Sequence, residues 1–129
     1  MKEIIGKTIN KIFTNDDQSV LVFETSEGDV IYQTEGDCCS ETWFADVTGV
    51  DALIGGTVQN AEDIEMETVV DGRTRQEEDE FYGVKIVTDK GHSSIVYRNS
   101  SNGYYGGNIN HVQIPRPELL VPITEDWSA

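Results

Sequence analysis

The first quarter of the chain alternates apolar and polar residues in short runs that turn-forming residues separate. Such alternation places successive side chains on opposite faces of a strand. It predicts strands over Ile9 to Thr14, Ser19 to Thr25 and Val30 to Thr34. The intervening Asn15-Asp16-Asp17-Gln18 and Ser26-Glu27-Gly28-Asp29 have turn composition. This part of the chain is therefore predicted to form a three-stranded β-meander.

A short helix is predicted near the middle of the chain. Val50, Leu53 and Ile54 have the spacing of one helical face, and Gly55-Gly56 follows them directly. Because paired glycines favour irregular backbone, we expect the helix to end there, so that it spans about Val50 to Ile54.

The opening of the chain recurs in its second half. Ile5-Gly6-Lys7-Thr8-Ile9 is echoed 49 residues later by Ile54-Gly55-Gly56-Thr57-Val58, and Leu21 to Gly28 is echoed 63 residues later by Val84 to Gly91. The difference of 14 residues predicts an insertion within Glu65 to Glu80. We interpret the echoes as two related β-meanders, over about residues 4–48 and 53–107. Convergence of two ordinary hairpins is the alternative.

Each bare meander has an apolar face to bury, so the two are expected to pack together. We predict a mostly β (β-rich α+β) fold, either a small sandwich or a partly closed barrel, with one short helix. The length predicts a single domain over residues 1–129. Residues 108–129 are predicted to form an extended C-terminal tail, because Pro115 and Pro117 exclude a central strand or helix interior. Its end, Glu125 to Ala129, is expected to be mobile.

The net charge of −15 narrows the classes of partner. Direct binding to nucleic acid or to an anionic membrane needs cationic groups on the protein, so we expect neither. The most acidic part, Glu62 to Glu80, is either a solvated loop or a surface that mimics a polyanion. With no long apolar run, the chain is predicted to be cytoplasmic, with reduced thiols.

The first candidate site segment is Gly36 to Phe44, which contains Asp37, Cys38, Cys39 and Trp43. The cysteines lack the spaced partners of a zinc site, so no metal and no cofactor is predicted. As a nucleophile, either thiol would need a base such as His92. The alternative is that the cysteines and Trp43 are structural, as buried cysteine and tryptophan commonly are.

The second candidate segment, Arg98 to Gly107, follows the third strand of the second half, as the cysteine segment does in the first. Its polar and aromatic residues suit an adaptable recognition surface; they are Arg98, Asn99, Asn102, Tyr104 and Tyr105. A long polar turn with glycines at positive φ is the alternative. We predict a ligand-binding site where the two segments meet.

With these motifs in view, the chain resembles an uncharacterised family of small proteins from bacteriophage and bacterial genomes. The resemblance rests on Gly36-Asp37-Cys38-Cys39-Ser40 with Trp43 and Phe44, and on Arg98-Asn99-Ser100-Ser101-Asn102-Gly103-Tyr104-Tyr105-Gly106-Gly107. Gly49-Val50-Asp51, with Leu53-Ile54-Gly55, adds to it. The resemblance implies a phage-related setting and supplies no mechanism.

Taken together, these observations favour a non-enzymatic binding protein that recognises a host protein or a small molecule. An acidic mimic of nucleic acid, blocking a host enzyme that binds DNA or RNA, is the first alternative. A small hydrolase or thiol enzyme that uses Cys38 or Cys39 with a histidine is the second.

Overall fold

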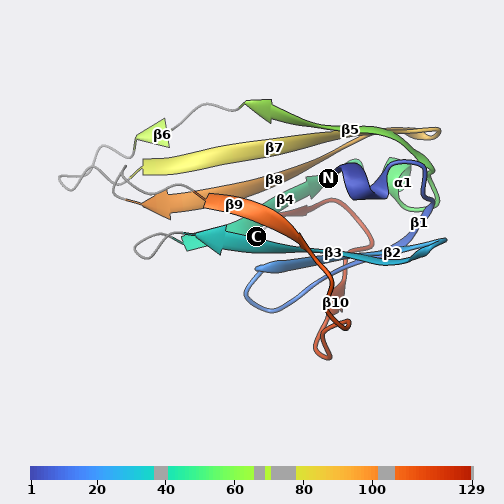
Figure 1. Ribbon diagram of the computed structural model, residues 1–129. Helices are drawn as coiled ribbons and strands as arrows, with labels where there is room; N and C mark the ends of the chain where they lie inside the picture. The colour runs from blue at the N-terminus through green and yellow to red at the C-terminus, as the bar shows by residue number, and fades with distance from the viewer. Residues whose placement is uncertain (37–40, 66–68, 71–77, 102–106, 129) are drawn as a thin grey trace.

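Two antiparallel β-sheets face each other, and a short helix lies at one end of this sandwich (Figure 1). The computed structural model describes residues 1–36, 41–65, 69–70, 78–101 and 107–128. The first sheet has the strand order β10-β1-β2-β3-β9. The second has the order β11-β4-β8-β7-β5, with β6 paired to β7. The sheets do not close into a barrel.

The elements follow the alternation of the sequence, and their bounds are as follows. They are η1 Lys2–Ile4, β1 Ile9–Thr14, β2 Val20–Thr25, β3 Gly28–Gly36, β4 Glu41–Thr48, α1 Val50–Leu53, β5 Val58–Glu65, β6 Val69–Val70, β7 Glu78–Thr88, β8 Gly91–Ser101, β9 Gly107–Val112, β10 Val121–Pro122 and β11 Trp127–Ser128. The described residues include no helix that is long and apolar enough to cross a bilayer.

The fourth strand of each half joins the sheet of the other half. In the chain, β4 follows β3, yet it pairs with β8 of the second sheet. In the same way β9 follows β8 but pairs with β3 of the first sheet. Because each half donates a strand to the other, the sheets are tied together by their backbones as well as by side-chain packing.

The echoed segments meet and make matching hydrogen bonds. Thr8 and Thr57 pair as an isolated antiparallel bridge, and their hydroxyl oxygens lie 2.9 Å apart. The N–H of Ser26 donates to the carbonyl of Thr8 at 3.0 Å, and the N–H of Asp89 donates to that of Thr57 at 3.2 Å. Equivalent positions of the two halves therefore share one local geometry.

The same correspondence extends into the strands. The register of β1 with β2 shifts just after Ile9, and that of β5 with β7 shifts just after Val58. Ahead of these strands, Gly6 and Gly55 have φ of 85° and 80°. That left-handed conformation favours glycine, which explains why each echo carries a glycine there.

The interior between the sheets is apolar, and it is built from the inward-facing residues of both. Its largest fully buried side chains include Tyr32, Phe23 and Phe44. A smaller cluster lies on the outer face of the first sheet, where Val20, Val22 and Ile31 are buried against Phe13, Val112 and Leu120. The first sheet thus buries apolar residues on both of its faces.

The C-terminal segment holds the two sheets together from outside. Its β10 pairs with β1, and its β11 pairs with β4. Ile123 between them is buried, and its N–H donates to the carbonyl of Ile12 at 2.8 Å. The Asp126 carboxylate accepts the N–H of Val50 at 3.0 Å, at the start of α1.

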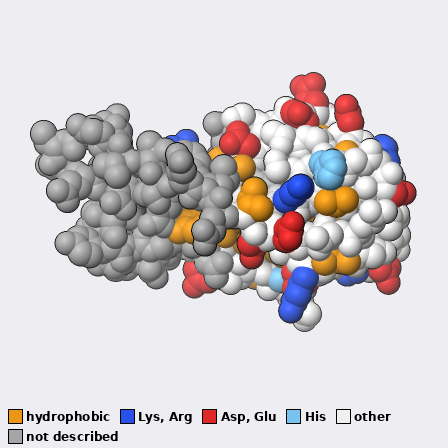
Figure 2. Space-filling model, turned by 90° about the horizontal axis from the view of Figure 1, so that it is seen from above, with side chains coloured by type: hydrophobic (Ala, Val, Ile, Leu, Met, Phe, Trp, Pro, Cys, Tyr) orange, Lys and Arg blue, Asp and Glu red, His pale blue; other side chains and the backbone are white. Residues whose placement is uncertain are grey.

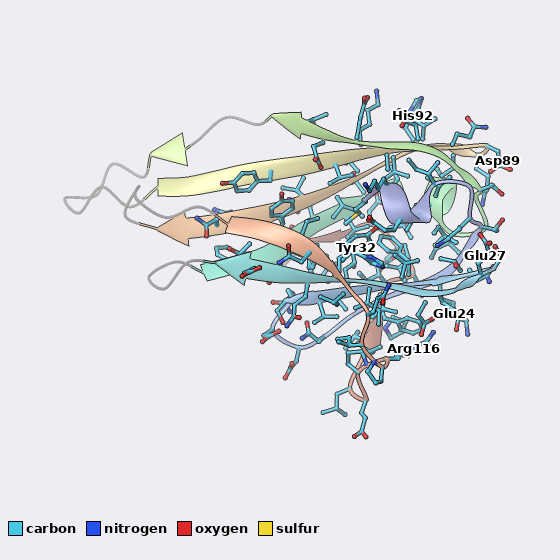
Figure 3. The ribbon with its side chains drawn as sticks, viewed as in Figure 1. Glu24, Glu27, Tyr32, Asp89, His92 and Arg116 are labelled. Carbon is cyan, nitrogen blue, oxygen red and sulfur yellow. The ribbon has the colours of Figure 1, made fainter. Side chains whose placement is uncertain are left out.

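Arg116 fixes the beginning of this segment over the first sheet (Figure 3). Its guanidinium lies 2.5 Å from a carboxylate oxygen of Asp29 and 3.1 Å from one of Glu24. It also lies 5.0 Å from the centre of the Phe13 ring. These contacts cover part of the outer apolar cluster, with the charged head left at the surface.

The predicted mostly β fold with one short helix is confirmed, and the architecture is the sandwich. At the C-terminus, residues 108–112 belong to β9 and Trp127–Ser128 forms β11. In both places the backbone pairs with a neighbouring strand, and the short sequences of these strands contain no pattern that predicts the pairing.

Candidate functional site

The two candidate segments meet where β4 and β8 pair. Trp43 is opposite Arg98 in the register, and Thr42 is opposite Asn99. Residues that are far apart in the sequence are therefore neighbours on adjacent strands. We call the face of these strands that presents Trp43 and Arg98, with Thr42 and Asn99 directly behind it, the β4–β8 surface.

Trp43 and Arg98 share one face of the second sheet. The Arg98 guanidinium carbon lies 5.5 Å from the centre of the Trp43 ring, within the range of a cation–π contact. Both side chains are half-buried, so each is partly held by its surroundings and partly open to solvent. Such a contact is worth about 0.5–1 kcal/mol at exposed sites and orients the planar guanidinium.

Thr42 and Asn99 lie on the opposite face of the same strands. The Thr42 hydroxyl donates to the Asn99 side-chain oxygen at 2.9 Å, and Asn99 is fully buried. A buried amide needs its hydrogen bonds, because water cannot replace them. This contact therefore holds β4 and β8 in register directly behind Trp43 and Arg98.

An aromatic cluster supports the same strands from the interior. Tyr97 stacks on Tyr82 with ring centres 4.9 Å apart and meets Phe44 edge-on at 6.5 Å. Burial, followed by the nearby charges of Asp63 and Tyr82, raises the pKa of Tyr97 to about 12. The Tyr97 hydroxyl is therefore neutral at physiological pH and serves as a packing group with a polar tip.

Three of the nine predicted site residues lie in the described part of the chain. The structure brings Trp43, Arg98 and Asn99 together. The other six lie outside the described residues; they are Asp37, Cys38, Cys39, Asn102, Tyr104 and Tyr105.

The sequence did not identify Thr42, Tyr82 and Tyr97, which support the β4–β8 surface from the interior. One signal for Tyr97 was available. Ile95 and Tyr97 are apolar or aromatic residues two positions apart, which is the spacing of one face of a strand, and the structure buries both. No comparable signal in the sequence identifies Thr42 as the partner of Asn99, because they are 57 residues apart.

The histidines are remote from the described residues that flank the cysteines. His92 is eight residues along β8 from Ser100, the partner of Glu41, a span of about 26 Å at the usual rise of a strand. His92 is also exposed and points away from the sandwich (Figure 3). His111 is four residues along β9 from the partner of Gly36, about 13 Å. The thiol-enzyme alternative gains no support from this arrangement.

A second polar cluster lies in the first sheet, at the middle of β3. The Tyr32 hydroxyl donates to a carboxylate oxygen of Glu3 at 2.9 Å, and the Tyr32 and His111 ring centres lie 5.7 Å apart. Burial, and then the Glu3 hydrogen bond and charge, raise the pKa of Tyr32 well above its usual value. Burial alone would raise the pKa of Glu3, but the Tyr32 hydrogen bond and nearby positive charges outweigh it and lower that pKa.

A hollow of about 330 Å³ lies beside β1, away from the β4–β8 surface. Its walls are mainly apolar and come from β1, the end of α1 and the C-terminal segment. They are formed by Asn10, Lys11, Ile12, Phe13, Ile54, Pro122, Ile123 and Thr124.

In the described part of the face seen from above, acidic side chains lie along much of the border and also near the middle, beside a basic side chain (Figure 2). Of the acidic stretch Glu62 to Glu80, the side chains of Glu62 and Asp63 are described, and both are exposed. The side chains from 65 to 80 lie outside the described part. Among the described residues, no group of three or more His, Cys, Asp and Glu is arranged to hold a metal ion.

A comparison with protein families gives one match. The model of a domain of unknown function (DUF7448) matches residues 2–111. No curated protein and no solved structure matches the chain. The matched range contains the whole β4–β8 surface and excludes β10 and β11.

Proposed function

The chain belongs to the family of unknown function DUF7448, because the family model matches residues 2–111. For this member of the family we propose a non-enzymatic binding function. In this proposal the chain is encoded by a phage and recognises a host protein through the β4–β8 surface. The phage setting follows from the resemblance of its motifs. A protein partner is favoured over a small molecule because tryptophan and arginine are residue types enriched at the centres of protein interfaces.

The observation that carries the proposal is the pairing of Trp43 with Arg98. Tryptophan and arginine are the residue types most enriched at the energetic centres of protein interfaces. Here they lie 5.5 Å apart on paired strands, and both remain partly accessible. A partner that covers them would remove the indole from water and find an oriented guanidinium beside it.

Rigid support behind this pair strengthens the proposal. Thr42 and Asn99 are hydrogen-bonded, and Tyr97 is stacked in the interior on the same strand. Side chains that are already held in place lose less conformational entropy on binding. The β4–β8 surface is therefore suited to binding without rearrangement of its strands.

Affinity capture from an extract of bacterial cells tests this function. The wild-type protein is immobilised beside the variants Trp43→Ala and Arg98→Ala, and retained proteins are identified by mass spectrometry. We expect a partner that the wild type retains and that both variants lose, with about a tenfold or greater fall in recovery, as for hot-spot residues. Lys7→Ala, which also removes one cation, is the matched control and is expected to retain the partner.

Thermal unfolding of each variant accompanies the capture. Because Trp43 and Arg98 are half-buried, we expect each variant to stay folded at the temperature of the experiment. If the same proteins are recovered with the wild type and with both variants, the β4–β8 surface is not the recognition site. Turnover of an added ester or peptide by the wild type would instead favour the enzyme alternative.

A further inference from the structure

The two halves present equivalent strand edges, and one of these edges is occupied. In β1, Ile9 is followed three residues later by Ile12; in β5, Val58 is followed three residues later by Ala61. Both strands have the same shift of register after their first residue. Ala61 of β5 therefore corresponds to Ile12 of β1, and both have backbone groups on the outer side of their strand.

The β1 edge shows how a segment is held at this position. The Ile123 N–H donates to the Ile12 carbonyl at 2.8 Å, and Val121 and Pro122 continue the pairing along Thr14 and Phe13. Ile123 is buried, and it lines the same hollow as Ile54, which is half-buried. An added strand and one apolar side chain therefore fill the edge.

The β5 edge is the unoccupied counterpart. Within the described residues β5 is the last strand of the second sheet. Gly6 and Lys7 hydrogen bond to the backbone of Val58 at its start, and no strand pairs with its outer side beyond that residue. Ile5, which corresponds to Ile54, has 40% of its surface exposed, and Ile64 farther along the strand has 39% exposed. An open row of backbone groups with apolar side chains beside it is a template for an added strand.

The side chains of the β5 edge determine what kind of segment fits it. Where β1 has Phe13 and Thr14, β5 has Glu62 and Asp63, and both of these acids are exposed. Carboxylates on an edge repel acidic strands and attract basic ones. A second copy of this chain fits poorly, because its net charge is −15.

We propose that the β5 edge is a second binding surface, which takes an extended, lysine- or arginine-bearing segment of a partner protein as an added antiparallel strand. One apolar side chain of that segment covers Ile5, as Ile123 covers the wall of the hollow at Ile54. Basic side chains of the segment face Glu62 and Asp63. The surface is separate from the β4–β8 surface, and it does not depend on the function proposed there.

A labelled short peptide with two consecutive lysines on each side of a central valine provides the probe, because consecutive residues of a strand point to opposite faces, as Glu62 and Asp63 do. Fluorescence polarisation measures its binding to the whole protein at low and moderate salt. We expect binding that weakens as salt rises from about 50 mM to about 500 mM, since exposed charges are screened. We expect the same peptide with glutamate in place of lysine to bind at least about tenfold more weakly. A version with a central proline should also bind more weakly, since proline cannot complete the strand pairing.

Two kinds of variant locate the bound peptide. Glu62→Lys/Asp63→Lys should weaken binding by about tenfold or more by reversing the charge of the edge. Asp16→Lys/Glu118→Lys changes the net charge equally at exposed positions elsewhere and should leave most of the affinity intact. Ala61→Pro removes the backbone N–H that, by correspondence with Ile12, faces outward, and it should also abolish binding. Circular dichroism checks that each variant is folded.

Three results would overturn the proposal. The first is no measurable binding of the lysine peptide at about 1 mM protein, a concentration that detects even weak complexes. The second is equal weakening by the edge variant and by the control variant, which would mean non-specific attraction to an acidic protein. The third is a wild-type dimer that the folded Glu62→Lys/Asp63→Lys variant loses, which would assign the edge to a second copy. Arg98→Ala should not change peptide binding, so the result is independent of the capture experiment.

Discussion

At the scale of single residues, Asn99 is the side chain on which the β4–β8 surface most depends. It is fully buried, and its side-chain oxygen accepts the hydroxyl of Thr42. Replacement of Asn99 by alanine removes the side-chain amide, so the Thr42 hydroxyl loses this hydrogen-bond acceptor. We therefore expect Asn99→Ala to lower the free energy of unfolding by about 1–3 kcal/mol.

The neighbouring Arg98→Ala provides the comparison for Asn99, because Arg98 is on the same strand but only half-buried. Arg98→Ala should therefore lower the free energy of unfolding by less, below about 1 kcal/mol. Urea denaturation at neutral pH measures both. An Asn99→Ala protein as stable as the wild type would show that the buried amide does not hold the strands together.

Glu3 is predicted to make stability depend on pH. Its pKa is lowered in the folded protein, where the Tyr32 hydrogen bond and the charges of His111 and the N-terminal amine favour the carboxylate. The stabilisation is therefore present above the unfolded pKa of about 4.3 and is lost as pH falls through the folded value.

Glu3→Gln tests this dependence, because the amide keeps the shape of the side chain but does not titrate. The wild type should be more stable than the variant at pH 6, and the difference should shrink as pH falls toward 3. Thermal unfolding across that range provides the measurement. A difference that stays constant with pH would exclude titration of Glu3 as its origin.

At the scale of elements, the sequence predicts the local strands well and their long-range partners poorly. Ile9–Thr14 forms a strand with the expected bounds, and the expected helix forms at Val50–Leu53. Alternation and glycine positions encode these elements locally. The exchange of β4 and β9 between the halves depends instead on packing between distant segments, which leaves no local pattern.

The candidate site was predictable to a similar extent. The repeat predicts that both segments follow the third strand of their half, whereas the structure places Arg98 and Asn99 within β8 and Trp43 within β4. The contact of Trp43 with Arg98 needs the register of β4 with β8, which a sequence alone does not contain. The matched hydrogen bonds of Thr8 and Thr57 agree with two related meanders, and their origin by duplication stays a prediction.

The C-terminal segment is predicted to be a structural part of the sandwich, although the family model ends before it. Ile123 is buried within this segment, with 3% of its surface exposed. Ile123→Ala should cost about 2–5 kcal/mol, as expected for truncation of a buried isoleucine.

Leu119→Ala is the matched control in the same segment, because Leu119 is 83% exposed. Its effect should lie within about 0.5 kcal/mol of zero. Chemical denaturation of both variants decides the point. Equal small losses would mean that the segment contributes little to the stability of the sheets.

At the scale of the whole molecule, the chain is strongly acidic and has two proposed binding surfaces of different charge. A net charge of −15 favours solubility and disfavours contact with other strongly acidic molecules. Against that background, the β4–β8 surface presents an indole and a guanidinium, whereas the β5 edge presents Glu62 and Asp63. The two surfaces thus differ in charge and are suited to different segments of partner proteins.

The central claim is that the β4–β8 surface recognises the partner, and the fluorescence of Trp43 tests it most directly. The chain has two tryptophans, so Trp127→Phe leaves Trp43 as the sole indole. The variant is titrated with the partner recovered by affinity capture, preferably as a version in which tryptophan is absent or replaced. We predict that Trp43 emission shifts to shorter wavelength and saturates with the binding curve, because the half-exposed ring becomes covered. Emission that stays unchanged while the partner binds would contradict the account.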